Sequence, residues 1–276
     1  MSIITLTTDY GLKDHFTGIL KGKIFSILPE TNIVDITHTI DKFNVLEASY
    51  LLSVSYSHFP KGTVHIVCVD ASRNADTMHI AMLYDGHYFI GADNGIFGGL
   101  TNKLNADKIV QINIHDRLIN GSSDLDVFAT VATHMAKGGE MNVIGTPLSE
   151  IKKMNVLVPI VDQNLNSIRG NVVYIDDFGN CVTNISKNYI EEVAKGRHYS
   201  VRFSSHTIKK VKNNYSDFKN NSTAALKSME GNEIALFNQD NFLEIAIYRS
   251  NPNRSGSANT LLGLKMQDVV IVEFTV

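Results

Sequence analysis

Tryptophan is absent from the sequence, and cysteine occurs only twice among 276 residues. Cys68 and Cys181 both lie inside apolar, strand-like stretches, which favours buried reduced thiols over a disulfide framework. No apolar run approaches the roughly 20 residues that a membrane-spanning helix needs. The segment MSIITLTTDY has neither a basic leader nor a small-residue cleavage site, so we expect no signal peptide, no membrane partner and a cytoplasmic location.

Strong charge of either sign is also missing. Lys and Arg number 25 against 28 Asp and Glu, a formal net charge of -3, so no attraction to nucleic acid is indicated. The sequence contains no glycine-rich phosphate loop, no GxSxG, no HExxH and no paired CxxC, and its ten histidines show no metal-ligand spacing. We therefore expect neither a metal nor a bound cofactor.

The first half of the chain alternates between strand and helix patterns. The pattern predicts strands at 3–7, 32–36, 63–69 and 108–114, helices at 18–28, 44–56 and 125–136, and a hairpin of 79–83 with 88–90. Such alternation is typical of a mainly parallel sheet with helices on its faces. Ligands of these sheets bind beyond the carboxyl ends of the strands.

The second half has a different pattern. Short strand-like runs at 170–175, 198–203, 232–236, 243–247 and 269–274 are separated by polar turns, and the clearest helix is at 187–194. This favours a small, mainly antiparallel β domain. We expect an N-terminal α/β domain at 1–155, a linker at 156–164 and a C-terminal β domain at 165–276.

Carboxylates follow two of the predicted strands. Asp9 and Asp14 lie in TTDYGLKD, between the first strand and the following helix, and Asp70 directly follows the strand in VCVDASRNADTMH. Two acids at two strand exits could meet in one cleft. Locally, however, Asp9 could equally cap the following helix, Asp14 could be surface charge, and Asp70 could be a loop cap.

Aromatic and polar residues gather in the second half as well. YIDDFGNCVTNI places Asp176, Phe178 and Asn180 in a glycine-containing turn between two apolar runs. This is either a structural Asx-type turn or a site for an amine-bearing, ring-containing ligand. Tyr215 and Phe242 could be core residues or could stack on a ligand.

Taken together, these stretches resemble one family over residues 3–275. The resemblance rests on LTTDYGLKDHFTGILKG, NIVDITHTI followed by FNVLEASYLL, FPKGTVHIVCVD, GADNGIFG, YIDDFGNCVTNI and the run from NYSDF to NQDNFLEIAIY. The family is that of the S-adenosyl-methionine hydrolases, or hydroxide adenosyltransferases, relatives of the fluorinating and chlorinating enzymes. The resemblance implies the N-terminal α/β domain and the C-terminal β domain predicted above, and a homotrimer with each ligand held between subunits.

The resemblance also implies roles for individual residues. Asp9 would accept hydrogen bonds from the two ribose hydroxyls, which suit the two oxygens of a carboxylate. Asp176 and Asn180 would hold the methionine amine and nearby groups, and Phe178 and Tyr215 would flank the adenine. The remaining ligand-binding positions implied by this matching are Asp14, Phe43 and Asn238.

Asp70 is the catalytic position implied by the resemblance. The halogenating relatives carry Tyr there and the hydrolases Asp, so the sequence favours water over halide as the nucleophile. The expected reaction converts S-adenosyl-methionine, as substrate, to adenosine and methionine by direct displacement at ribose C5′. The alternatives are a nucleoside- or S-adenosyl-methionine-binding protein without turnover, halide-dependent adenosyl transfer, and a trimeric scaffold without a small ligand.

The chain departs from the hydrolase pattern near Asp70. Thr77 and Met78 stand where the hydrolases carry a double arginine, and Ser123 and Leu125 stand where they carry the histidine and arginine of an HGRD segment. Only the Asp of the hydrolases' Asp–Arg–His trio is retained.

Two nearby residues are candidates to replace the missing partners, Arg73 and His79. The chain also reads Gln239 and Asp240 where relatives place a Ser and an Arg or aromatic residue near the methionine carboxylate. An acid at Asp240 would repel that carboxylate.

Overall fold

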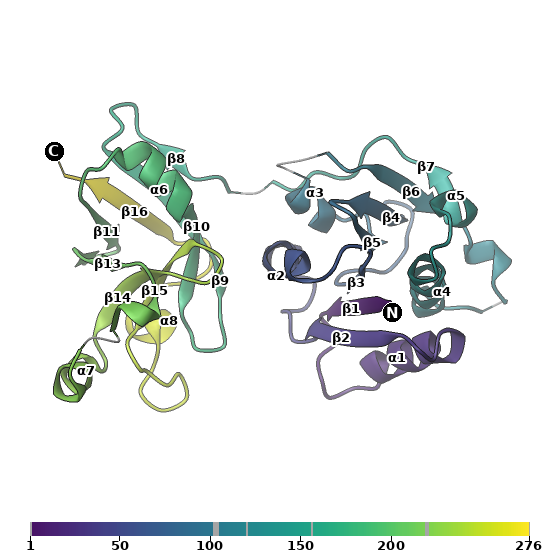
Figure 1. Ribbon diagram of the computed structural model, residues 1–276, viewed down its shortest axis with the longest axis horizontal. Coiled ribbons are helices and arrows are strands. Elements are labelled where there is room, and N and C mark those ends of the chain that lie inside the picture. The colour runs from purple at the N-terminus through teal and green to yellow at the C-terminus, as the bar shows by residue number, and fades with distance from the viewer. Residues whose placement is uncertain (1, 102–104, 120, 156, 219–220, 276) are drawn as a thin grey trace. The chain divides into compact units, whose positions relative to one another are not determined.

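The computed structural model describes residues 2–101, 105–119, 121–155, 157–218 and 221–275 (Figure 1). The chain divides into two compact units, Met1–Val156 and Leu157–Val276. Each unit has its own hydrophobic core. Within the described ranges, no helix is both long enough and apolar enough to cross a bilayer.

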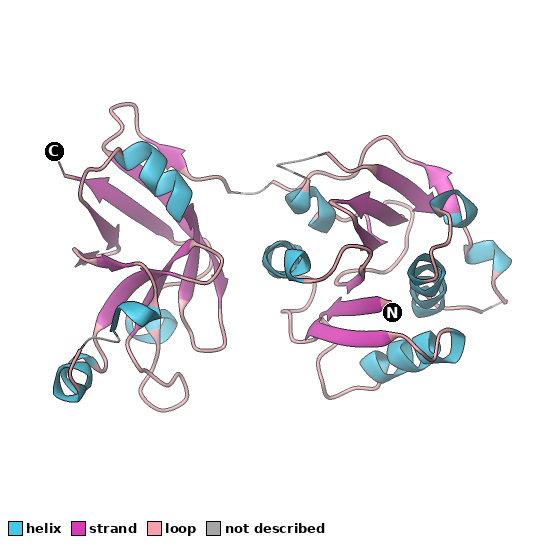
Figure 2. Cartoon of the chain, in the orientation of Figure 1, coloured by secondary structure: helices cyan, strands magenta, loops and turns pink. Residues whose placement is uncertain are grey.

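The N-terminal unit is a seven-stranded sheet with helices on both faces (Figure 2). Its strands are β1 (Ile3–Thr8), β2 (Asn32–Thr37), β3 (Val64–Cys68), β4 (His79–Tyr84), β5 (His87–Ala92), β6 (Lys108–Ile112) and β7 (Gly145–Pro147). Its helices are α1 (Phe16–Ile27), α2 (Val45–Ser55), α3 (Ile96–Leu100), α4 (Asp124–Ala136) and α5 (Met141–Ile144), with 3₁₀ turns η1 (Tyr56–His58) and η2 (His115–Arg117).

The sheet is mixed, so the prediction of a mainly parallel sheet holds for only one half of it. The strand order is β2-β1-β3-β5-β4-β6-β7. The pairs β1–β2, β1–β3 and β3–β5 are parallel, whereas β4–β5, β4–β6 and β6–β7 are antiparallel. The predicted hairpin explains the change, because the two-residue turn Asp85-Gly86 can join only antiparallel neighbours.

The helices cover the sheet because each has an apolar stripe. Leu20 and Ile24 of α1 and Phe128 of α4 are fully buried in the core on one face of the sheet. Leu52 of α2 and Phe97 of α3 pack into the core on the other face. This layered packing fixes the carboxyl edge of the strands in place.

The antiparallel half of the sheet brings additional residues to the carboxyl edge of the parallel half. His79, the first residue of β4, lies opposite Ala92, the last residue of β5. Gln111, near the end of β6, pairs with Ile80 of β4. The ends of β1, β3, β5 and β6 and the start of β4 therefore share one edge.

Gly91 is expected to be essential for packing within this sheet. A Cβ at Gly91 would lie 2.7 Å from the main-chain oxygen of Val67 and 3.1 Å from the Phe97 ring. Gly91→Ala should therefore lower the free energy of unfolding by about 1–3 kcal/mol, as overpacking does. Gly18→Ala in α1, where a Cβ meets nothing within 4 Å, should instead raise it by about 0.5–1 kcal/mol. Urea denaturation of both variants measures the difference, and equal stability would contradict this account.

The C-terminal unit is a nine-stranded sheet, mainly antiparallel, in which β13 and β14 form the one parallel pair of the described strands. Its strands are β8 (Ile160–Val161), β9 (Ser167–Ile175), β10 (Cys181–Ser186), β11 (Tyr199–Phe203), β12 (His206–Ile208), β13 (Val211–Lys212), β14 (Glu233–Phe237), β15 (Phe242–Ile247) and β16 (Val269–Phe274). Its helices are α6 (Lys187–Ala194), α7 (Thr223–Met229) and α8 (Ala258–Leu261), with the 3₁₀ turn η3 (Tyr215–Phe218). Helix α6 has the bounds that the sequence pattern predicts.

Candidate functional site

Three polar side chains follow adjacent parallel strands of the N-terminal unit. Thr8 at the end of β1 lies opposite Cys68 at the end of β3, and Val67 of β3 lies opposite Gly91 of β5. Asp9 directly follows β1, and Asp70 and Asn94 are each two residues past the ends of β3 and β5, so the chain delivers all three to the same edge of the sheet. This is the edge at which sheets of this kind bind ligands.

Asp9 is held by the loop between β2 and α2. The main-chain N–H of Phe43 donates to Asp9 Oδ2 at 3.0 Å, and Lys42 Nζ donates to the main-chain oxygen of Asp9. Asp9 is only 6% exposed, whereas Phe43 is highly exposed. The N-cap of α1 is His15, so Asp9 does not cap that helix. One carboxylate oxygen has a main-chain donor, which fixes the orientation of the group.

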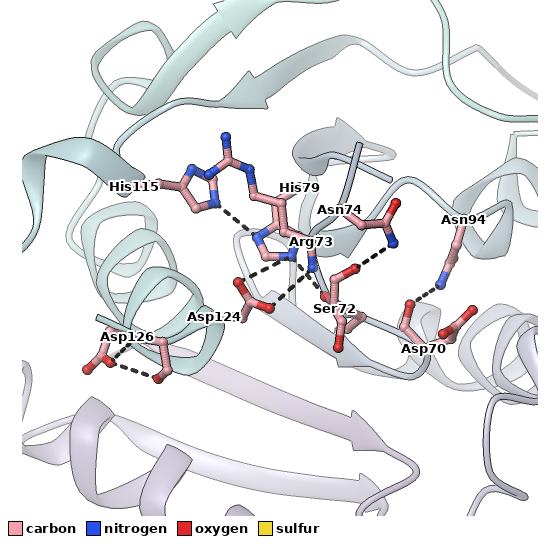
Figure 3. A network of polar contacts seen from close by, with 11 residues as sticks. Asp70, Ser72, Arg73, Asn74, His79, Asn94, His115, Asp124 and Asp126 are labelled. Carbon is pink, nitrogen blue, oxygen red and sulfur yellow. Dashed lines mark hydrogen bonds and ion pairs between the residues drawn. The ribbon is translucent and has the colours of Figure 1, made fainter. Parts of the chain in front are cut away.

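Asp70 occupies a left-handed backbone conformation, with φ of 45°. Asn94 stabilises it, because Asn94 Nδ2 donates to the main-chain oxygens of Val69 and Asp70 at 2.9 and 3.0 Å (Figure 3). The left-handed region is costly for most residues and is tolerated best by Gly, Asn and Asp. The exposed Asp70 side chain is thus carried on a backbone turn that Asn94 secures.

His79 secures the other end of the Asp70 loop. Its ring is fully buried, and Nε2 donates to the main-chain oxygen of Ala71 at 2.8 Å. Because a carbonyl can only accept, Nδ1 is the unprotonated nitrogen and accepts from His115 Nε2 at 3.1 Å. Burial lowers the pKa of His79 and outweighs the Ala71 hydrogen bond and the charge of Asp124, which raise it, while the charge of Arg73 lowers it further. The ring is therefore neutral near pH 7.

Asp124 joins Arg73 to this histidine pair. Its Oδ2 accepts from the main-chain N–H of Arg73 at 3.2 Å, and its Oδ1 lies 4.0 Å from His79 Nε2 (Figure 3). Burial and the charge of Arg73 also lower the pKa of His115. The two residues named from sequence as replacements, Arg73 and His79, therefore belong to one network with His115 and Asp124. The sequence did not indicate His115 or Asp124 as site residues, because each is simply the first residue of its element, η2 and α4.

The positions that differ from the hydrolase pattern have structural roles here. Ser123 donates from its main-chain N and from Oγ to Asp126 Oδ2, both at 2.8 Å, at the start of α4. Leu125 packs against the core beneath that helix, and Met78 packs against the core on the opposite face. The main-chain oxygen of Thr77 accepts from the N–H of Asn74 within the loop at 3.1 Å.

In the C-terminal unit, Asp176 and Asn180 bind each other across the β9–β10 turn. Asp176 Oδ1 accepts from the N–H of Asn180 at 2.8 Å, and Oδ2 accepts from Asn180 Nδ2 at 2.9 Å. Gly179 provides the left-handed residue that this turn requires, with φ of 73°. The turn presents the ring of Phe178, which is 68% exposed. The Asx-type turn expected from sequence therefore also displays an aromatic ring.

Glu244 is a candidate site residue that sequence reasoning missed. It is 5% exposed, and its Oε1 accepts from the hydroxyl of the half-exposed Tyr215 at 3.0 Å. The pKa of Glu244 is raised to about 7, because burial and the charge of Asp176 raise it by more than the Tyr215 hydrogen bond lowers it. The available signal was an acid inside the apolar run LEIAI, where a buried charge needs a reason.

The remaining predicted residues lie in loops. Asn238 Oδ1 accepts from the main-chain N–H groups of Asp240 and Phe242, both at 3.0 Å, and so shapes the NQDN turn. Asp14 is exposed in the loop before α1. Among the described residues, no group of three or more His, Cys, Asp or Glu side chains could hold a metal ion.

The division into two units agrees with comparisons to known proteins. Residues 4–145 match the model of the SAM hydroxide adenosyltransferase N-terminal domain, and residues 170–271 match that of the C-terminal domain. The two matches cover most of the chain and follow its two compact units. The chain belongs to the SAM hydroxide adenosyltransferase family.

Individual relatives are similar along most of their length. A protein of Methanocaldococcus jannaschii named (R)-S-adenosyl-L-methionine hydrolase is 30% identical over 267 residues, covering 92% of this chain and 91% of the relative. A protein of the same name from Salinispora tropica is 28% identical, covering 70% and 75%. The crystal structure of an uncharacterized conserved protein from Thermotoga maritima has a TM-score of 0.81 and 27% identity, covering 98% of this chain and 99% of that one.

Proposed function

We propose that this protein hydrolyses S-adenosyl-methionine to adenosine and methionine. The observation that carries the proposal is the placement of Asp70. It follows β3, the strand beside β1, which leads into Asp9, and Asn94 holds it in a left-handed conformation. A carboxylate on a fixed turn at the ligand-binding edge can orient a water molecule. The relative from M. jannaschii, whose name denotes this hydrolysis, supports the same reaction.

The reaction needs little covalent chemistry from the protein. Methionine is a good leaving group, because the substrate sulfur is already a positively charged sulfonium. The water oxygen forms a bond to ribose C5′ as the C5′–S bond breaks, and that electron pair goes to sulfur. Asp70 orients the water and accepts its proton, while Asp9 holds the ribose hydroxyls so that C5′ lies in line.

Water is a better nucleophile than halide for this site. The carboxylate of Asp70 attracts the protons of water but repels a halide ion through its negative charge. Halide-dependent adenosyl transfer is therefore the less favoured chemistry.

The test is to incubate the purified full-length protein with S-adenosyl-methionine and follow adenosine by chromatography, with and without chloride. We expect adenosine in both conditions, at rates that do not depend on chloride. Formation of 5′-chloroadenosine would favour halide transfer. Binding of S-adenosyl-methionine with no adenosine above the protein-free control would overturn the hydrolase proposal.

A second candidate function is S-adenosyl-methionine or nucleoside binding without turnover. The observation that favours it is that Ser123 is the N-cap of α4 and Leu125 packs against the core, so both have structural roles. These positions carry the missing catalytic groups in the hydrolases. The adenosine assay above separates the two functions.

We further propose a cytoplasmic homotrimer in which two subunits contribute to each nucleoside site. The family resemblance supports the trimer, and the two free, buried thiols are consistent with a reducing compartment. Light scattering should report three chains per particle. A monomer at working concentration that still binds S-adenosyl-methionine tightly would contradict the shared site.

A further inference from the structure

Glu244 lies on the same face of the C-terminal sheet as Asp176 and Asn180. Val182 of β10 is paired with Tyr174 of β9 on one side and with Glu244 of β15 on the other. Cross-strand partners point to the same face. Asp176 comes two residues after Tyr174, and Asn180 comes two residues before Val182. Because side chains two residues apart in an extended chain point the same way, both share that face.

The neighbours of Glu244 in β15 point the other way, into the main core of the unit. Leu243, Ile245 and Ile247 are all part of that core. Above the Glu244 face lies η3, whose Tyr215 hydroxyl donates to Glu244 Oε1 at 3.0 Å. The acid is therefore positioned by a hydrogen bond from a residue expected to contact the ligand.

The charge of Glu244 has no cationic partner among the described residues. No ion pair among the described residues of the C-terminal unit includes Glu244 or Asp176. Glu244 Oε2 accepts no hydrogen bond from these described residues, whereas Oε1 accepts from Tyr215. The titratable groups facing Glu244 are Tyr215 from η3 and Asp176 from the β9–β10 turn. The thiol of Cys181, which pairs with Ile245, points into the core on the opposite face. Each is neutral or negative, so none offsets the cost of burying the carboxylate.

A buried carboxylate in these surroundings can be neutralised in two ways, by a proton or by a cation from outside. We propose that Glu244 is a specificity-determining residue, whose Oε2 receives a cationic group of the ligand in exchange for a proton. The ligand brings an ammonium and a sulfonium, if the proposed function is right, and the inference rests on that function. The proton leaves to solvent, and no covalent bond changes.

The exchange predicts that binding of S-adenosyl-methionine releases protons. With a Glu244 pKa of about 7, close to half of the molecules are protonated at pH 7, so we expect about half a proton released per ligand. Hydrolysis itself releases one proton per turnover, so the number is measured on full-length protein carrying Asp70→Asn, which is expected to bind but hardly to turn over. Titration calorimetry in two buffers of different ionisation enthalpy gives the protons released by binding alone. Adenosine has no cationic group and should release none through Glu244. S-adenosyl-homocysteine keeps the ammonium but lacks the sulfonium, so it identifies which group is bound.

Glu244→Gln keeps the shape of the side chain and an acceptor for the Tyr215 hydroxyl. It should abolish the proton release and weaken S-adenosyl-methionine binding by about 10-fold or more, with adenosine binding nearly unchanged. Glu273→Gln is the matched control, because it removes the same charge from a surface ion pair with Arg202 in the same unit. This control should behave as the wild type.

Tyr215→Phe provides a second variant that does not depend on the folding of the first. It removes the hydrogen bond that lowers the pKa of Glu244, so proton release at pH 7 should rise from about half toward one. A purely structural role for Glu244 would not change the proton count in this direction.

The outcomes separate the inference from the proposed function. Proton release that Glu244→Gln abolishes, without adenosine formation, supports the inference and overturns the hydrolase proposal. S-adenosyl-methionine binding with no release that depends on Glu244 overturns the inference and leaves hydrolysis standing. No binding of S-adenosyl-methionine by the wild type overturns both.

Discussion

Asp70→Asn is expected to lower the rate of adenosine formation by about 10²- to 10⁴-fold, the usual contribution of a general base, and to leave S-adenosyl-methionine binding nearly unchanged. The amide can still accept a hydrogen bond from water but cannot take its proton. Asparagine is a better replacement than alanine, because it tolerates the left-handed backbone at this position, where φ is 45°. Single-turnover kinetics and calorimetry measure the two quantities separately.

Asp76→Asn is the matched control for Asp70. It makes the same change of charge at an exposed position in the same loop, where the main-chain oxygen of Asp76 accepts from Lys152. Its rate should equal that of the wild type. If Asp70→Asn is as fast as the wild type, the enzyme proposal can stand, but Asp70 is not the group that activates water.

Asp9→Asn is expected to weaken binding of both adenosine and S-adenosyl-methionine by about 10- to 100-fold. One carboxylate oxygen becomes a donor, so one of the two ribose hydroxyls loses its acceptor, and a hydrogen bond to a charged group contributes about 1.5–3 kcal/mol. The remaining oxygen can still accept from Phe43 N, which preserves the loop contact. Calorimetry with adenosine gives the affinity without the complication of turnover.

Asp107→Asn serves as the control for Asp9. Asp107 is exposed just before β6, at the opposite edge of the sheet, and its N–H donates to the main-chain oxygen of Leu83. Its affinity for adenosine should match that of the wild type. A folded Asp9→Asn protein with unchanged adenosine affinity would contradict the assignment of Asp9 to the ribose.

Local sequence patterns were sufficient to predict most elements of the fold. The β-branched run around residues 63–69 becomes β3, and the Asp85-Gly86 turn produces the β4–β5 hairpin. The pattern at 187–194 becomes α6, which Ser186 caps by accepting from the N–H of Tyr189. These features depend on side-chain periodicity and on turn conformations over a few residues, so they can be predicted before any tertiary contact is known.

The direction of each strand was harder to predict. Strand–helix alternation favours a parallel sheet, yet β4 to β7 pair in antiparallel fashion. Pairing partners far apart in the chain are decided by how whole layers pack. As a result, the sequence predicted acids at the ends of β1 and β3, but it did not predict that β4 and β6 would bring His79 and His115 to the same edge.

What the sequence by itself determined is the order of the elements, the acids at two strand exits and the aspartate–aromatic–asparagine turn at 176–180. What only the tertiary structure decided is the ionisation and orientation of the groups around them. The neutral state of His79 depends on burial, the orientation of its ring depends on hydrogen bonds with Ala71 and His115, and the raised pKa of Glu244 depends on burial beside Asp176. Such effects arise between residues brought together across the sheet, and their strength depends on distance and local solvation, which neighbours in sequence do not set.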